Sequence, residues 1–343
     1  MAAKDFILKN FLILGLLTVI TFGIICPGPG TWLNVQSIGG LTLSDYAIDI
    51  IFVVSGLCLD SAADALKPKA LTLGVVLVLF VTPALAFPIL ALKKMDDSLS
   101  YPLLQGMGLF CVVPTTLSSG VTMITQAKGN VSLAILLTSV TNIIGVFTMS
   151  VTAPSIFSLT TIAINKLDML RELLFLTLLP LLVGMILRRS IKPLREFATK
   201  YKKPLGLTQN SCILFVVLMN ISKAQPNIIA SKPKDLSLCF MLAISVHLIY
   251  RILGYVVATA AKLEPPDWVS IVLMCSQKSL PVCVSVMTAL PAELRANSGL
   301  FIIPCIMAHA AQLIIDSILA VRWEVQADGK FTIDSKKQPL LPA

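Results

Sequence analysis

A lysine lies in the middle of an apolar segment, in the stretch MCSQKSLPV at residues 274–282. Lys278 is too far from both ends of that segment for its side chain to reach a membrane surface. An unpaired ammonium in hydrocarbon costs on the order of 3 kcal/mol, so Lys278 needs partners. The candidates are Asp316, Asp49 and the carbonyl and hydroxyl groups of a helix break near Pro114. We expect a role in substrate or ion handling, with a structural ion pair between helices as the alternative.

Two apolar segments are interrupted by proline together with serine or threonine. The interruptions are CVVPTTLSSGV at 111–121 and CSQKSLPVCV at 275–284. Pro114 and Pro281 each remove a backbone donor and free a carbonyl, so both helices should kink or unwind there. In hydrocarbon such groups are tolerated only where they line a cavity or are buried against protein. Each break alone is equally compatible with a proline kink whose freed backbone groups are bonded by Ser or Thr side chains. The presence of two such breaks predicts a polar site halfway through the membrane.

Further polar residues share single faces of apolar helices. In GLFIIPCIMAHAAQLIID, His309, Gln312 and Asp316 are three and four residues apart. His309 is equally compatible with packing, and Asp316 with a place near the headgroups. Thr138 and Asn142 share a face of another segment. The predicted substrate- or ion-binding residues are Pro114, Thr115, Thr116, Ser118, Ser119, Thr138, Asn142, Gln277, Lys278, Ser279, His309, Gln312 and Asp316.

The elements that must position these residues are membrane spans. The chain has 343 residues, of which 56% are hydrophobic and 13% charged, and its mean hydropathy is +0.87. These values identify a membrane protein with no room for a soluble domain. Segments of about 20 apolar residues, each long enough to cross the bilayer, recur along the chain. The predicted spans are 10–26, 42–59, 71–92, 101–126, 130–158, 168–188, 207–222, 236–261, 267–290 and 297–321. The first is expected to be a retained helix.

Basic residues are unevenly distributed between the loops. With the N-terminus inside, the inside loops carry 17 Lys and Arg and the outside loops 8, so both termini are predicted to face the inside. Arg171 and Arg188, near the ends of the span 168–188, are counted with the loops, and the other two within spans are Arg251 and Lys278. Arg251 shares a face with His247, and for these two residues we expect snorkelling or pairing with a loop. The scattered basic residues predict membrane lipid, not nucleic acid, as a partner. The eight cysteines show no metal or disulfide spacing, and the oligomeric state stays open.

Ten spans divide into two units of five. A duplicated unit with an odd number of spans enters the membrane from the opposite side the second time, which gives the inverted repeat of many secondary transporters. We therefore expect an all-α integral membrane protein with repeats at 1–160 and 161–323, followed by a polar tail at 324–343. The broken fourth and ninth spans occupy corresponding places in the two repeats.

Three stretches, at 110–148, 276–286 and 299–323, resemble the bile acid:sodium symporter family, most closely its plant and algal plastid branch of probable sodium/metabolite cotransporters. The resemblance implies a panel domain of spans one, two, six and seven, and a core domain in which the fourth and ninth helices cross. It also implies two sodium sites beside the crossing. The ligands that carry over are Ser119, Thr138 and Gln277. The Ser-Asn pair of the family's fourth helix corresponds to Ser119 with Gly120, or to Ser118 with Ser119 if the register shifts. Leu273 stands where the family has an acidic ligand, and Lys278 where it has Asn.

We hypothesise that the Lys278 ammonium replaces one bound sodium ion. A fixed cation opposes a second cation at low dielectric, so sodium coupling is expected to be weakened or lost. Proton coupling is the alternative, because a buried lysine can lose its proton near neutral pH. No other cofactor is expected.

The predicted function is secondary transport of a small anionic metabolite by alternating access. The expected location is the chloroplast envelope if the source is a plant or alga, and otherwise the plasma membrane or an endomembrane. The alternative is a membrane regulator without transport, like the orphan vertebrate branch of the family, which is associated with calcium handling. An intramembrane hydrolase based on Ser279 beside Lys278 lacks a Ser–His or paired-Asp motif.

Overall fold

A computed structural model describes residues 11–59, 67–116, 119–157, 164–295 and 298–337. The described chain is almost entirely helical; its two short strands, β1 (Ser37–Ile38) and β2 (Leu41–Thr42), form one hairpin. The first half holds α2 (Phe11–Ile25), α3 (Pro27–Asn34), α4 (Leu43–Cys58), α5 (Pro68–Val76), α6 (Ala86–Met95), α7 (Tyr101–Val112), α8 (Ser119–Gln126) and α9 (Val131–Ile156). The second half holds α10 (Lys166–Leu173), α11 (Leu179–Ser190), α12 (Lys192–Lys200), α13 (Lys202–Ala230), α14 (Pro233–Ala260), α15 (Pro265–Met274), α16 (Leu280–Thr288), α17 (Ala292–Arg295) and α18 (Ser298–Lys337).

Every predicted apolar segment contains helix. Among the described residues, six helices are long and apolar enough to cross a membrane, and the bent pair α2 and α3, with an angle of 96°, makes a seventh if counted as one span. The six are Pro68–Met95, Val131–Ile156, Lys166–Ser190, Lys202–Ala230, Pro233–Ala260 and Gly299–Glu324. The all-α integral membrane class is therefore confirmed, while the count of ten spans and the inverted repeat stay predictions.

Two of the long helices contain a π-helical turn next to a proline. The segment η2 (Leu77–Val81) joins α5 to the short 3₁₀ helix η3 (Thr82–Leu85), and η4 (Leu174–Leu178) joins α10 to α11. In η2 the backbone bonds run from residue i+5 to residue i, so the carbonyl of Val78 would need the N–H of Pro83, which proline lacks. The sequence TP thus leaves the Val78 carbonyl without this backbone donor, and the Thr82 hydroxyl donates to it instead at 2.9 Å.

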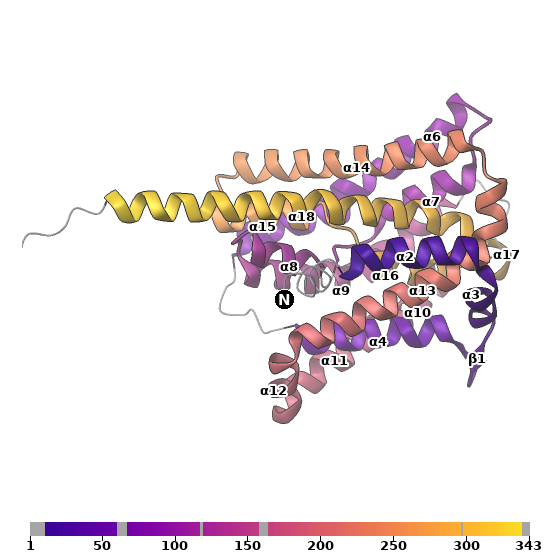
Figure 1. The fold of residues 1–343 in the computed structure, drawn as a ribbon, viewed down its shortest axis with the longest axis horizontal. Helices are drawn as coiled ribbons and strands as arrows, with labels where there is room; N and C mark the ends of the chain where they lie inside the picture. Colours follow the sequence, from indigo (N-terminus) through magenta and orange to yellow (C-terminus); the bar gives the residue numbers. More distant parts are fainter. Residues whose placement is uncertain (1–10, 60–66, 117–118, 158–163, 296–297, 338–343) are drawn as a thin grey trace, which may run out of the picture.

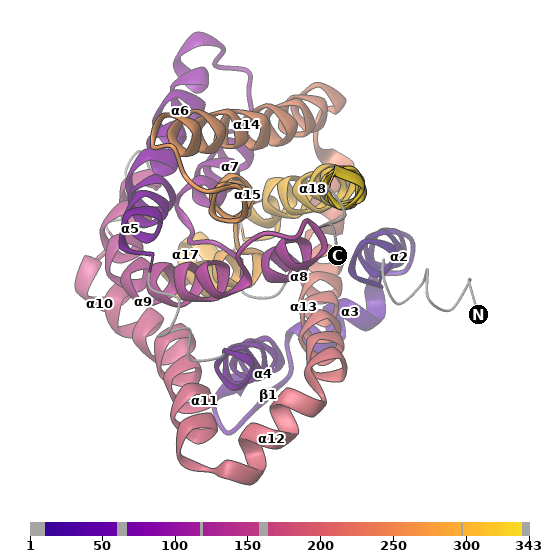
Figure 2. The ribbon, with the colours of Figure 1, turned by 90° about the vertical axis from the view of Figure 1, so that its left-hand side faces the viewer.

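The helices pack in two groups. In the first group α4 packs on α11, and α13 packs on α2, α3 and α4. In the second group α18 packs on α7 and α14, and α15 packs on α14 and α9. Figure 2 shows α4, α11 and α12 at the lower side of the bundle and α14, α15 and α18 at the upper side. α13 contacts α18, and α16 contacts α4, so the two groups meet along these helices.

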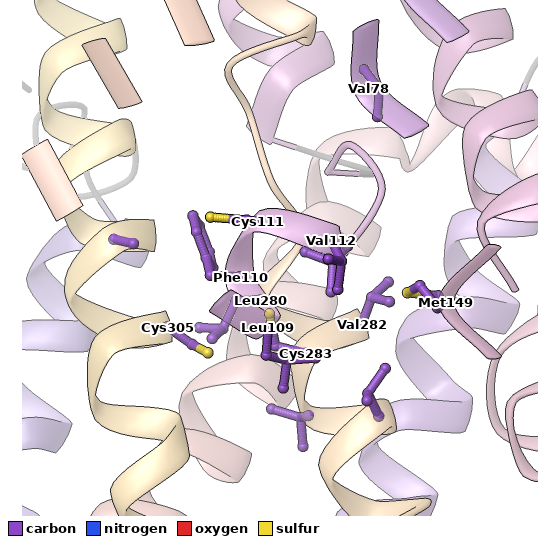
Figure 3. Close-up of a cluster of buried hydrophobic side chains, with 14 of the residues drawn as sticks. Val78, Leu109, Phe110, Cys111, Val112, Met149, Leu280, Val282, Cys283 and Cys305 are labelled. Carbon is purple, nitrogen blue, oxygen red and sulfur yellow. The ribbon is translucent and has the colours of Figure 1, made fainter. Parts of the chain in front are cut away.

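The two interrupted spans lie inside the bundle. α7 and α8 flank one break, and α15 and α16 flank the other; every residue from Ile271 to Leu280 is buried. A layer of apolar side chains surrounds the breaks, including Val112, Leu280 and Cys283 (Figure 3). α18 runs beside them along the long axis of the molecule and continues beyond the other helices (Figure 1). The fold therefore places both breaks away from lipid.

Close backbone contact between α4 and α11 should make Gly184 intolerant of a side chain. A Cβ at Gly184 would lie 2.1 Å from the carbonyl oxygen of Val53, whereas a Cβ at Gly206 would meet nothing within 4 Å. We expect Gly184→Val to cost about 1–3 kcal/mol or more by overpacking and to lower the apparent melting temperature in detergent micelles. Gly206→Val is the matched control. Equal melting temperatures for the two variants would contradict the close packing.

Candidate functional site

The backbones of the two breaks pair with each other. Thr115 and Lys278 form an isolated antiparallel bridge, in which the N–H of Thr116 donates to the carbonyl of Gln277 at 3.3 Å and the N–H of Ser279 donates to that of Pro114 at 3.1 Å. Proline disfavours the helical conformation of the residue before it, and Val113 is accordingly extended (φ −72°, ψ 152°). Each unwound segment thus satisfies polar groups that the other exposes.

The Lys278 amine is fully buried, at 0% exposure, and donates three hydrogen bonds. Its acceptors are the carbonyl of Val78 at 3.0 Å, the hydroxyl of Thr82 at 2.8 Å and the carbonyl of Val113 at 2.9 Å. The Tyr250 ring centroid lies 5.4 Å from Nζ, within range of a cation–π interaction. The expected contact with the Pro114 break is confirmed through Val113. Val78 and Thr82 were not predicted; the Thr-Pro pair in their span was the available signal.

The two carboxylates predicted as counter-charges for Lys278 do not contact it. Within the described chain, the amine forms no ion pair, and Asp316 instead pairs with Arg251, while no ion pair involves Asp49. The prediction of a carboxylate partner is therefore wrong. Three oxygen acceptors and an aromatic face satisfy this cation in place of an opposite charge.

Gln312 holds the second break against α18. Its Oε1 accepts from the N–H of Lys278 at 2.9 Å, and its Nε2 donates to the carbonyl of the same residue at 2.7 Å. These two bonds fix the orientation of the amide, so its Nε2 also donates to Nδ1 of His309 at 2.8 Å. Nδ1 of His309 is then an acceptor, and the ring proton resides on Nε2. His309 and Gln312, predicted from one helix face, act here on the backbone at Lys278.

Side chains of α9 support the first break. Nδ2 of Asn142 donates to the carbonyls of Thr115 at 3.0 Å and Thr138 at 2.8 Å, and the Thr138 hydroxyl approaches the carbonyl of Thr116 at 3.4 Å. The Thr115 hydroxyl crosses to the other break and donates to the carbonyl of Met274 at 2.9 Å, which satisfies the C-terminal end of α15. The predicted sharing of one helix face by Thr138 and Asn142 thus brings both to the unwound backbone.

The residues expected to bind sodium gather around Thr116. Its hydroxyl lies 3.1 Å from that of Ser119, its carbonyl meets Thr138, and its N–H meets the carbonyl of Gln277. Ser118, the ligand in the shifted register, lies outside the described residues. Among the described groups in contact with Thr116 there is no carboxylate, so the oxygens available to a cation there come from hydroxyl, amide and carbonyl groups.

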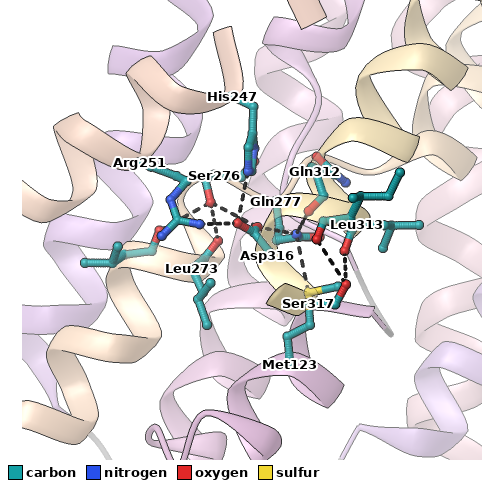
Figure 4. A network of polar contacts seen from close by, with 12 residues as sticks. Met123, His247, Arg251, Leu273, Ser276, Gln277, Gln312, Leu313, Asp316 and Ser317 are labelled. Carbon is teal, nitrogen blue, oxygen red and sulfur yellow. Dashed lines mark hydrogen bonds and ion pairs between the residues drawn. The ribbon is translucent and has the colours of Figure 1, made fainter. Parts of the chain in front are cut away.

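Asp316 is the centre of a second buried polar network (Figure 4). Its Oδ1 accepts from Nη1 of Arg251 at 2.5 Å and lies 3.0 Å from Nε2 of His247, and its Oδ2 accepts from Nε2 of Gln277 at 2.5 Å. Nδ1 of His247 lies 3.2 Å from the carbonyl of Ser276. The expected snorkelling or loop pairing of His247 and Arg251 is wrong, because both turn inward to Asp316. The four-residue spacing of a histidine and an arginine in an apolar helix was the signal for this network.

Four predicted site residues keep a buried polar atom without a hydrogen-bond partner in the described chain. The atoms are Asn142 Oδ1, Gln277 Oε1, Ser279 Oγ and His309 Nε2. Leaving such a group unpaired costs about 1–3 kcal/mol. Gln277 and Ser279 lie at a break, Asn142 bonds to Thr115 of the other break, and His309 bonds to Gln312, which holds Lys278. Unmet hydrogen-bonding capacity is therefore present at this crossing, as expected of a ligand or ion site.

Two interrupted helices that cross inside an apolar bundle, with polar groups converging on the crossing, are the architecture of secondary transporters. The chain belongs to the SBF-like CPA transporter family, which it matches over residues 10–325. It is thus an integral multi-pass membrane transporter and not an enzyme. This agrees with the resemblance to the bile acid:sodium symporter family predicted from the three stretches.

Curated relatives cover nearly the whole chain. It is 29% identical over 347 residues to "Probable sodium/metabolite cotransporter BASS4, chloroplastic" of Oryza sativa, covering 96% of this chain and 79% of the relative. It is 28% identical to the protein of the same name from Arabidopsis thaliana, covering 93% and 73% of the two chains. It is 26% identical to "Sodium/bile acid cotransporter 7" of Mus musculus, covering 81% and 82%.

The Asp316 network should behave as a coupled unit in unfolding. Removing one partner of a buried ion pair costs about 3–5 kcal/mol, because the other charge stays buried and unpaired. We expect Asp316→Asn to lower the free energy of unfolding in detergent micelles by this amount, and by much less when Arg251→Gln is already present. Asp97→Asn, at the exposed pair of Asp97 with Lys93, is the control and should be nearly neutral. Additive losses for Asp316 and Arg251 would refute direct coupling.

Proposed function

We propose that this protein is a secondary active transporter that moves a small organic anion by alternating access. The observation that carries the proposal is the pairing of two unwound helix segments around the buried amine of Lys278. A site of this kind at the crossing can be exposed to either side when one group of helices moves against the other. The packing of α4 and α11 apart from α7 and α14, with the two groups in contact along α13 and α18, supports a panel and a core that move as bodies.

The proposed repeat boundary divides the chain into 1–160 and 161–323, followed by the tail at 324–343. The division puts one break in each unit, at 111–121 and 275–284. An antiparallel bridge between the breaks is what a pair of inverted units would produce at their symmetry axis. Both termini are proposed to face the inside, from the distribution of basic residues.

We propose that Lys278 takes the place of one sodium ion, and that sodium coupling is weakened or absent. Two carbonyls and one hydroxyl surround its amine, and oxygens of these kinds are ligands that hard cations take in proteins. A second cation a few ångströms away would meet repulsion of several kcal/mol at intermediate dielectric. Leu273 supplies no carboxylate to offset it, and Arg251 already neutralises Asp316.

An anionic cargo fits the charge of this site. The amine contributes one fixed positive charge, and the N-terminus of α16 begins directly after the break. The polar atoms Ser279 Oγ, Gln277 Oε1 and His309 Nε2, which have no hydrogen-bond partner in the described chain, can contact the polar groups of a small metabolite. Relatives named as sodium/metabolite cotransporters support the metabolite class, and their chloroplastic naming supports a chloroplast envelope location if the source is a plant or alga.

Uptake into liposomes tests transport. We expect the purified chain to accumulate at least one member of a panel of small organic anions. We expect Lys278→Met to reduce the initial rate by about tenfold or more, because the buried Val113 carbonyl loses its amine donor and the crossing is disturbed. Lys94→Met, at an exposed position at the end of α6, is the control and should transport normally. Absence of uptake across a broad panel by a folded protein would favour a regulatory role without transport.

Restoring the ligands of the wider family should create a response to sodium. The double variant Leu273→Glu with Lys278→Asn adds a carboxylate and removes the competing charge. Because a ligand that binds the folded state stabilises it, we expect millimolar sodium to raise the melting temperature of this variant above its value in potassium. Leu273→Gln with Lys278→Asn is the control that lacks the charge. If the double variant ignores sodium, the proposed exchange of amine for ion is wrong.

A further inference from the structure

A short amphipathic helix joins two long apolar ones at one end of the bundle. α12 links the end of α11 to the start of α13 and runs across the lower side of the bundle in Figure 2. Leu194, Phe197 and Tyr201 follow each other at spacings of three and four residues and share one face. Lys192, Arg195 and Glu196 lie on the opposite face, and Lys200 lies at the edge between the two faces. A helix with this division suits a boundary between an apolar and a polar phase.

The aromatic residue of α12 and the one directly after the helix are partly exposed. Phe197 is 47% exposed and Tyr201 is 40% exposed, with ring centroids 4.9 Å apart, and Ile191 just before the helix is 42% exposed. Ala198 on the same face is buried and packs inward. Aromatic rings at the end of membrane helices are typical of the headgroup layer. The exposed rings therefore have a natural environment at the bilayer surface.

Exposed positive charge is concentrated around the same helix. Six exposed Lys and Arg occur between residues 189 and 203, against one acidic residue, Glu196, whose carboxylate is 4.0 Å from the Lys192 amine. The six are Arg189, Lys192, Arg195, Lys200, Lys202 and Lys203. The local excess of positive charge attracts anionic groups that lie within a Debye length.

A buried arginine fixes the position of α12. The guanidinium of Arg188, 7% exposed, donates from Nη1 to the carbonyl of Leu57 at 2.6 Å and from Nη2 to the hydroxyl of Thr199 at 3.3 Å. Leu57 is at the C-terminal end of α4, where a cation is favourable. Since α11 ends at Ser190 and α13 begins at Lys202, the helix between them is held at the level where the apolar spans end. α12 and its exposed basic residues are therefore held in place, and Arg188 connects them to the end of α4.

We propose that α12 and its flanking basic residues form a docking surface for the anionic headgroups of phospholipids. Three features favour a lipid surface over an acidic soluble protein: the basic face lies beside exposed aromatic rings, both lie at the ends of apolar spans, and α4 and α11 hold the helix in place. Anionic headgroups bound here steady the end of α4 through Arg188 and Thr199. The surface is separate from the crossing of the broken helices, so it does not depend on the proposed cargo.

The test compares phospholipids bound to the full chain in neutral detergent. Native mass spectrometry counts retained phosphatidylglycerol and phosphatidylcholine, and a melting curve is recorded with each lipid. We expect the unmodified chain to retain phosphatidylglycerol in preference to phosphatidylcholine. In a variant with Lys192, Arg195, Lys200 and Lys203 changed to Gln, this preference should fall by about tenfold or more, since each surface charge contributes about fivefold to the affinity for an anionic lipid. A control variant changes four exposed basic residues elsewhere to Gln: Lys94, Lys166, Arg171 and Lys232.

The control variant should keep the preference, and 0.5 M salt should weaken it, as roughly expected for screened surface charges. Equal lipid retention by the α12 variant and the unmodified chain would overturn the proposal. Equal loss in both variants would also overturn it, because the effect would then reflect total charge. If inorganic phosphate alone reproduces the stabilisation, the surface is a general anion site and the assignment to lipid fails.

Discussion

A helix that unwinds inside a membrane must find partners for its backbone within the protein, and this constraint shapes the centre of the molecule. The break near Pro114 and the break near Pro281 meet this need by bonding to each other. The amine of Lys278 then donates to the carbonyl of Val113 and to that of Val78, which also accepts from the Thr82 hydroxyl in the absence of a backbone donor. One lysine thus connects three spans through carbonyls and a hydroxyl that no water reaches in hydrocarbon.

The same constraint assigns distinct roles to the polar residues of α18. The side-chain amide of Gln312 forms two hydrogen bonds with the backbone of Lys278, as a neighbouring β-strand would. Asp316 contacts Arg251, His247 and Gln277, and Arg251 neutralises its charge. Both positive side chains near the crossing are therefore matched with oxygens supplied by the chain. Under the proposed function, these fixed cations take the place of ions that relatives would draw from solution.

Sequence reasoning located the breaks and the buried lysine, because proline and charge in apolar segments have direct physical consequences. It also grouped Thr138 with Asn142 and His309 with Gln312, since helical spacing alone determines a shared face. The predicted carboxylate partner of Lys278 was wrong. The sequence shows that Asp316 carries the opposite charge, but it does not show that Asp316 forms its ion pair with Arg251 instead. The acceptors at Val78 and Thr82 depend on the register of a π-helical turn and on how α5 packs, which no local pattern of residues specifies.

The central claim is that a tethered amine has replaced a free cation at the crossing. The most direct measurement is the melting temperature of the unmodified protein in detergent, recorded in sodium and in potassium at equal ionic strength. The same temperature is expected in both salts, because the proposed exchange puts the Lys278 amine where a bound sodium ion would lie. A sodium-specific rise at millimolar concentration, absent with potassium, would contradict it.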